Sequence, residues 1–78
     1  MREIKIGKKY KHFKGHLYVV EAIAKDSETL ESVIVYKNID TNEYWVRGYE
    51  MFNSLVDTVK YPEVEQKYRF EEVGDGNE

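Results

Sequence analysis

Alternating apolar and polar positions near the start of the chain predict a β-hairpin. Residues 9–13 alternate between two sides, with Tyr10 and His12 on the same side. Lys14-Gly15 supplies a glycine-containing turn, and a second strand follows at residues 17–24. Because this second strand carries apolar residues on both sides, we expect a central strand that is covered on two faces.

The middle of the chain predicts two more strands that are separated by polar turns. The Val-Ile-Val-Tyr run places one strand at residues 32–37, and residues 43–47 return as the next. The turns fall at residues 26–29 and 40–42, where Asp, Ser, Thr and Asn side chains can hydrogen-bond the nearby backbone. Strands that follow one another through such short turns pair in antiparallel fashion.

The C-terminal third carries weaker patterns. Residues 49–52 fit one short helical or 3₁₀ turn whose Met51 and Phe52 plug the core. A weak strand is expected at residues 55–59 and a last strand at residues 67–73.

Five short strands without a long helix favour a rolled sheet, which buries a core and protects its edges. We therefore expect an all-β fold, a small, partly open antiparallel barrel of about five strands with SH3-like or OB-like size. A chain of 78 residues indicates one domain, expected at residues 1–73, followed by a disordered acidic tail at residues 74–78.

Composition agrees with a small globular β domain. The chain has seven tyrosines, three phenylalanines and one tryptophan, and aromatic side chains suit a pleated sheet. It contains no cysteine, which excludes disulfides and thiol nucleophiles. Neither a secretory signal nor a membrane-spanning run is visible, so we expect a cytoplasmic protein.

Charge is distributed unevenly along the chain. The net charge is −3, yet residues 1–16 hold six Lys or Arg and a single Glu. Whether this basic segment forms a basic surface depends on which acidic residues the fold places beside it.

Three short motifs resemble a known family. They are Y-x-H-F-K-G at residues 10–15, S-E-T-x-E at residues 27–31 and W-V-R at residues 45–47. In this order and spacing, over about residues 7–73, the chain resembles the small bacterial family called domain of unknown function 1653. The resemblance implies a compact, β-rich bacterial domain, and it implies no activity because none is assigned to that family.

The motifs contain side chains that a core does not require, and these define the expected binding face. Trp45 and Arg47 lie on one side of their strand, and we expect Arg47 to pair with Glu28 or Glu31 and thereby order the loop at residues 26–31. The complete expected face consists of His12, Lys14, Ser27, Glu28, Glu31, Trp45 and Arg47.

A protein- or peptide-interaction module is the function that we expect. One small core cannot hold every tyrosine, so an exposed patch drawn from Tyr36, Tyr44, Tyr49 and Tyr61 should lie beside Arg47. Tyr and Arg are frequent anchors of protein interfaces. The partner is an unknown protein or peptide, no membrane is involved, and the chain is expected to be a monomer or a weak homodimer.

Binding of single-stranded nucleic acid, such as RNA, is the alternative. Lysines would contact phosphates while aromatic rings stack on bases. The expected contacts are Lys8, Lys9, Tyr10, Lys11 and Phe13.

A small-ligand or metal-dependent enzyme is less favoured. His12 and His16 could ligate a metal together with a carboxylate of the next loop, which would be Glu28, Glu31 or Asp26. Ser27, His12 and Glu28 have the residue types of a triad. The histidines do not converge across a hairpin turn, and no glycine-framed nucleophile motif is present. We therefore expect no catalytic residue, metal site or cofactor, and we expect His12 to pack at the rim of the barrel and donate to a carboxylate such as Glu28.

Overall fold

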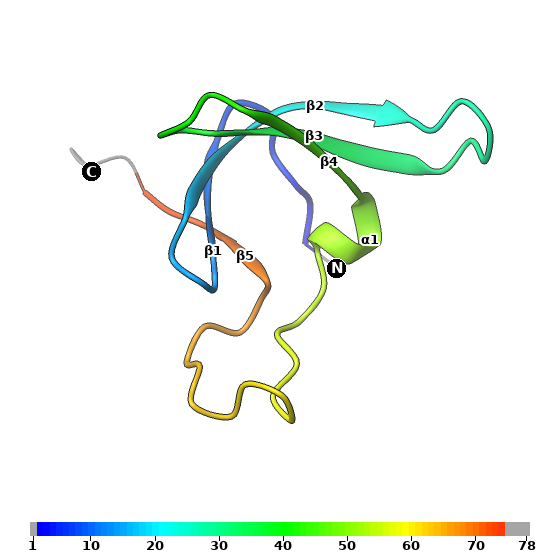
Figure 1. The fold of residues 1–78 in the computed structure, drawn as a ribbon. Coiled ribbons are helices and arrows are strands. Elements are labelled where there is room, and N and C mark those ends of the chain that lie inside the picture. Colours follow the sequence, from blue (N-terminus) through cyan, green and yellow to red (C-terminus); the bar gives the residue numbers. More distant parts are fainter. Residues whose placement is uncertain (1, 75–78) are drawn as a thin grey trace.

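The computed structural model describes residues 2–74, so most of the expected tail, residues 75–78, lies outside the described part. The chain forms five strands and one short helix (Figure 1): β1 (Lys9–His12), β2 (Leu17–Lys25), β3 (Ser32–Asn38), β4 (Tyr44–Gly48), α1 (Tyr49–Phe52) and β5 (Phe70–Glu72). In residues 2–74, no helix has the length and apolar character needed to cross a membrane.

All five strands belong to one antiparallel sheet with the order β4-β3-β2-β1-β5. The sheet bends, so that β2, β3 and β4 form an upper layer while β1 and β5 lie below it (Figure 1). A shift of register between Val20 and Ala22 marks a β-bulge, which increases local twist where β2 passes from one layer to the other. The predicted small, partly open all-β barrel is confirmed.

The core fills the space on the inner side of the bent sheet. The Phe52 and Phe70 rings stack at 4.0 Å between centroids, which joins α1 to β5. Tyr36 meets both rings edge to face. The buried cluster comprises Ile4, Tyr10, Val20, Ile34, Tyr36, Phe52 and Phe70. Of the two residues expected to plug the core from residues 49–52, Phe52 does so, whereas Met51 is 54% exposed and that prediction is wrong.

The expected strand at residues 55–59 does not form, because pairing ends after Val56, whose N–H donates to the Lys67 carbonyl. Only Leu55 makes a β-bridge, to Tyr68. The Asp57 carboxylate accepts hydrogen bonds from the backbone N–H groups of Val59 and Lys60, which closes a turn. The last strand is also shorter than expected and covers only Phe70–Glu72.

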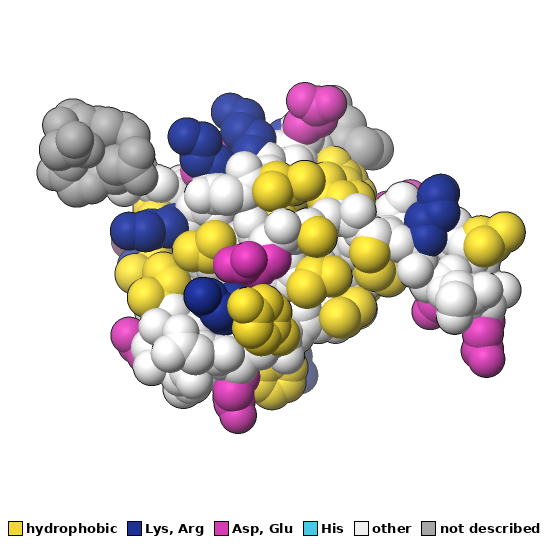
Figure 2. Space-filling model, turned by 90° about the horizontal axis from the view of Figure 1, so that it is seen from above, with side chains coloured by type: hydrophobic (Ala, Val, Ile, Leu, Met, Phe, Trp, Pro, Cys, Tyr) yellow, Lys and Arg dark blue, Asp and Glu magenta, His cyan; other side chains and the backbone are white. Residues whose placement is uncertain are grey.

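Strand β2 is central, as predicted, but it is covered on one face only. Register places Val19, Ala22 and Ala24 on the side away from the core, opposite Lys37, Val35 and Val33 of β3. Viewed from above, apolar side chains lie open across this side of the sheet (Figure 2). The prediction that β2 is covered on two faces is therefore wrong for residues 2–74, although the strand carries apolar residues on both sides.

Candidate anion-binding site

The turn between β1 and β2 positions the first two side chains of the site. Gly15 adopts φ 108°, a conformation that favours glycine, and its N–H donates to the His12 carbonyl at 2.7 Å. The N–H of Lys14 donates to Nδ1 of His12 at 3.1 Å, so the neutral ring carries its proton on Nε2. The ring stacks on Phe13 and meets Phe70 edge to face, which fixes its orientation.

The segment between α1 and β5 supplies the opposite wall. The N–H of Phe13 donates to the Arg69 carbonyl at 3.0 Å, and the N–H of Arg69 donates to the Ser54 carbonyl at 2.8 Å. These bonds tie the segment to the hairpin. They bring Tyr61 to within 5.0 Å of Phe13, measured between ring centroids.

Strand β4 contributes Arg47 from the inner side of the sheet. Arg47 lies opposite Ile34, and its Nε donates to the hydroxyl of Tyr36 at 3.3 Å. The guanidinium carbon lies 5.8 Å from the centre of the Phe70 ring. Arg47 is therefore held by aromatic contacts rather than by a carboxylate.

These three elements enclose a cavity of about 290 Å³, which we call the cationic pocket. Its lining is His12, Phe13, Lys14, Arg47, Asp57, Lys60, Tyr61 and Arg69. The lining comes from the end of β1, the β1–β2 turn, β4 and the segment that follows α1.

Positive charge in the pocket lacks close counter-ions. Four lining side chains are Lys or Arg and one is Asp. Asp57 already accepts two backbone hydrogen bonds. In residues 2–74, the single ion pair within 4.0 Å joins Lys5 to Glu72, outside this lining. Like charges gathered without carboxylate partners repel one another, and a bound anion would relieve that repulsion.

His12 contributes hydrogen-bonding capacity rather than charge. Burial, and to a smaller extent the neighbouring Arg47, Arg69 and Lys14 charges, lower the pKa of His12 to about 4. The ring is therefore neutral near pH 7, and its Nε2–H remains a donor.

Aromatic rings line the pocket between the charges. The Nζ atoms of Lys14 and Lys60 lie 5.6 and 5.5 Å from the centre of the Tyr61 ring. Such cation–π contacts hold lysine side chains over an apolar wall without neutralising them.

The structure divides the expected binding face into two parts. His12, Lys14 and Arg47 meet in the cationic pocket. Trp45, 48% exposed, shares the inner side of β4 with Arg47, as predicted. The remaining residues, Ser27, Glu28 and Glu31, lie in and beside the turn between β2 and β3.

The predicted pairing of Arg47 with Glu28 or Glu31 is wrong. Within the described residues, neither carboxylate lies within 4.0 Å of Arg47. The loop at residues 26–31 is instead ordered by the Asp26 carboxylate, which accepts hydrogen bonds from the N–H groups of Glu28 and Thr29. These bonds lower the pKa of Asp26. The expected donation from His12 to Glu28 is also absent, because Nδ1 accepts from Lys14 and no carboxylate is among the groups that shift the pKa of His12.

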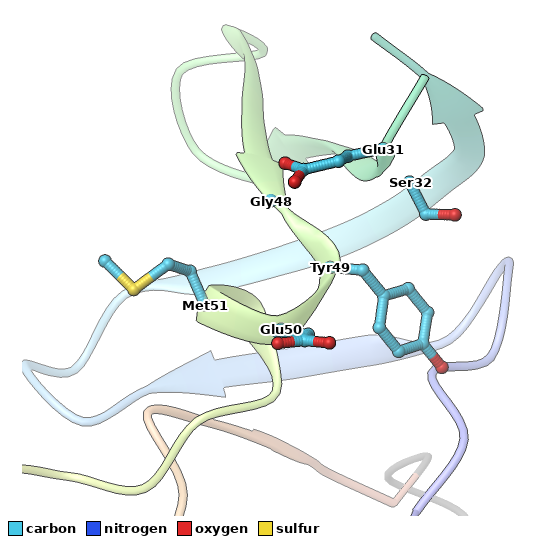
Figure 3. A pocket seen from close by; sticks show the side chains of 6 residues that line it. All are labelled: Glu31, Ser32, Gly48, Tyr49, Glu50 and Met51. Atoms are coloured by element: carbon cyan, nitrogen blue, oxygen red, sulfur yellow. The ribbon is translucent and has the colours of Figure 1, made fainter. Parts of the chain in front are cut away.

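Glu31 lines a different cavity, shown in Figure 3, where β3, β4 and α1 meet. Its lining is Glu31, Ser32, Gly48, Tyr49, Glu50 and Met51. The two carboxylates make this cavity acidic, in contrast to the cationic pocket. In residues 2–74, no group of three or more His, Asp or Glu side chains could hold a metal.

Most residues of the expected nucleic-acid surface do not form one surface. Tyr10 is 1% exposed and packs in the core, so it cannot stack on a base. Register places Lys9 and Lys11 opposite Val19 and Leu17 on the outer side of the sheet. Lys8 is exposed just before β1, and only Phe13 of this set lines the pocket.

The expected tyrosine patch forms only in part. Tyr36 touches Arg47 but is 4% exposed, whereas Tyr44 is 62% exposed on the outer side of β4. Tyr49 packs against the core, and Tyr61 is half-buried in the pocket wall.

Sequence reasoning missed Lys60 and Arg69, and it named Tyr61 only as a member of the tyrosine patch beside Arg47. The pairing of a lysine with a tyrosine at residues 60–61 is a weak signal, and Arg69 stands beside a core phenylalanine. Only the hydrogen bonds that fold this segment onto the hairpin make them part of a site.

A family model described as "Protein of unknown function (DUF1653)" matches residues 8–72, most of the chain. The chain belongs to this family. The matched DUF1653 region includes every residue that lines the cationic pocket. Searches of curated proteins and of solved structures gave no match to the chain.

Proposed function

We propose that this DUF1653 chain is a non-catalytic interaction module that binds an acidic peptide segment of a protein partner in the cationic pocket. The observation that carries the proposal is the convergence of Lys14, Arg47, Lys60 and Arg69 on one cavity with a single carboxylate in its lining.

The polar groups suit carboxylates. Arginine offers a planar set of N–H donors that matches a carboxylate, and both pocket arginines are already held by a side-chain hydrogen bond from Nε. The Nε2–H of neutral His12 adds a donor. Bound carboxylates would offset the positive charge of the four Lys and Arg side chains, which Asp57 alone does not balance.

The dimensions favour a short acidic segment over a nucleic-acid strand. A cavity of about 290 Å³ accommodates one or two side chains. A single strand needs a basic track that follows several phosphates. Lys9 and Lys11, the other candidates for such a track, lie on the outer side of the sheet.

Amide-resolved NMR titration with a short Glu- and Asp-rich peptide tests the proposal. We expect shifts at residues 12–14, 47, 60–61 and 69 that weaken with salt, because exposed charges are screened. The variant Lys14→Gln/Lys60→Gln should weaken binding about tenfold, a typical loss for two charged contacts.

Lys9→Gln/Lys11→Gln is the matched control, because it removes the same charge from the outer side of the sheet. It should leave the affinity within about twofold. Equal losses in both variants would reduce the interaction to non-specific charge attraction and contradict the proposal. Shifts in the pocket with single-stranded RNA and none with the peptide would favour the nucleic-acid alternative instead.

A further inference from the structure

The upper layer of the sheet has an apolar outer face that the described chain leaves uncovered. We define the outer face as the side chains of β2, β3 and β4 that alternate away from the core: Val19, Ala22, Ala24, Val33, Val35, Tyr44 and Val46. Tyr44 is 62% exposed and Val46 is 63% exposed. Contiguous apolar surface of this kind marks interaction sites on small proteins.

Charged groups stand at opposite ends of the outer face. Lys9 and Lys37 flank Val19 from the two neighbouring strands, at the end where β2 begins. At the other end, the turn between β2 and β3 exposes Asp26, Glu28 and Glu31. Figure 2 shows most of the dark blue Lys and Arg side chains of this view on its left, whereas the turn that projects at the right carries acidic side chains together with a dark blue one.

One carboxylate shares the outer face with these lysines: Glu21, the exposed residue at the β-bulge between Val19 and Ala22. This end therefore holds two lysines against one glutamate and keeps a net positive charge.

The other charged residues near the two ends alternate to the inner side or lie in a turn. The alternation along β4 places Glu43 on the inner side of the sheet, next to the outward-facing Tyr44. Its carboxylate accepts a hydrogen bond from the Thr41 hydroxyl. Asp40 lies at the tip of the β3–β4 turn, and its N–H donates to Asn38. Lys25, at the acidic end, is paired with Ser32 and alternates to the inner side.

We propose that the outer face binds a second copy of this chain, with the two sheets packed face to face. A two-fold axis running across the strands places the lysine end of one copy over the acidic end of the other, at both ends of the contact. The same operation packs apolar residues against apolar residues, as an interface with two-fold symmetry requires. The cationic pocket lies on the inner side, so this proposal does not rest on the proposed function.

Sedimentation equilibrium over a range of about 10 µM to 1 mM measures the association directly. We expect a concentration-dependent dimer for the natural chain. Val46→Glu should raise its dissociation constant at least about tenfold, because it places a charge within the apolar contact beside Val35. Val59→Glu is the matched control, since Val59 is 91% exposed in the segment after α1 and should leave the constant unchanged.

Charge reversal tests the orientation. Lys9→Glu/Lys37→Glu makes both ends acidic, and Glu28→Lys/Glu31→Lys makes both ends basic, so each variant alone should be monomeric. Mixed in equal amounts, the two variants should form a heterodimer. A natural chain that stays monomeric throughout, a dimer that survives Val46→Glu, or a mixture that does not associate would each overturn the proposal.

Discussion

His12 connects the cationic pocket to the pH dependence of stability. Its folded-state pKa of about 4 lies below its ordinary value of 6.5, chiefly through burial. Between these values the unfolded chain binds the proton and the folded chain does not. The stabilisation is therefore complete above about pH 6.5 and is lost as pH falls toward 4.

The variant His12→Gln tests this assignment. Glutamine can still accept the N–H of Lys14, but it does not titrate. We expect the free energy of unfolding, measured by urea denaturation between about pH 7 and 4, to fall less steeply in the variant than in the natural chain. His16→Gln, in the same turn, should retain the natural slope because His12 is intact. Identical slopes in all three proteins would contradict a buried, neutral His12.

At the scale of single residues, sequence patterns predicted the side of a strand on which a residue lies better than the residues that it contacts. Alternation placed Trp45 and Arg47 on one side of their strand, and register confirms it. The same alternation separates Lys9 and Lys11 from Tyr10, which is why a lysine run with interleaved aromatics does not form one surface. Arg47 donates to the hydroxyl of Tyr36, which lies on the neighbouring strand β3 opposite Trp45. Nothing local in the sequence specifies this partner.

At the scale of elements, β4 and α1 meet at Gly48, a position that does not need glycine. Gly48 has φ −54° and ψ 144°, and a Cβ atom there would meet no atom within 4 Å. Gly48→Ala should raise the free energy of unfolding by about 0.4–1 kcal/mol, because alanine restricts the unfolded chain.

Gly15→Ala is the matched comparison. Its Cβ would also have open space, but the φ of 108° is unfavourable for alanine. We expect a loss of about 1 kcal/mol or more in the same denaturation experiment. Destabilisation by both substitutions would show that the corner between β4 and α1 needs the freedom of glycine.

The hairpins were predictable because their signals are local. The turn at Gly15 and the Val-Ile-Val-Tyr run fix β1, β2 and β3 to within one residue. The segment after α1 was not predictable in the same way. Its apolar residues suggested a strand, whereas the side chain of Asp57 closes a turn that removes the backbone donors.

For the whole molecule, the pocket depends on a segment distant in sequence from the hairpin that it faces. Lys14 and Arg69 lie 55 positions apart in the chain, yet both line the same cavity. Backbone bonds from Phe13 to Arg69 and from Val56 to Lys67 hold the segment in place. The pocket forms only when the segment after α1 folds against the β1–β2 hairpin. The sequence of the segment or of the hairpin alone therefore does not predict it.

Gln66 anchors this segment to β1 and gives the last prediction. Its Nε2 donates to the Lys11 carbonyl at 2.8 Å and to the Tyr68 carbonyl at 2.9 Å. Gln66→Ala removes both bonds while leaving the buried aromatic cluster intact. We expect the free energy of unfolding to fall by about 1 kcal/mol. Amide exchange should accelerate at Val56 and Arg69, whose N–H groups close the segment.

The loosened segment should also weaken the pocket, because Lys60, Tyr61 and Arg69 would no longer be held against the hairpin. We expect the affinity for the acidic peptide to fall about three- to tenfold, the cost of ordering part of a binding site on contact. Glu65→Ala is the control, since Glu65 is the exposed neighbour of Gln66 and makes none of these bonds. Faster exchange spread evenly over β1–β4 in Gln66→Ala would contradict a local anchor. Slower or unchanged exchange at Val56 would mean that the backbone bonds alone hold the wall of the pocket in place.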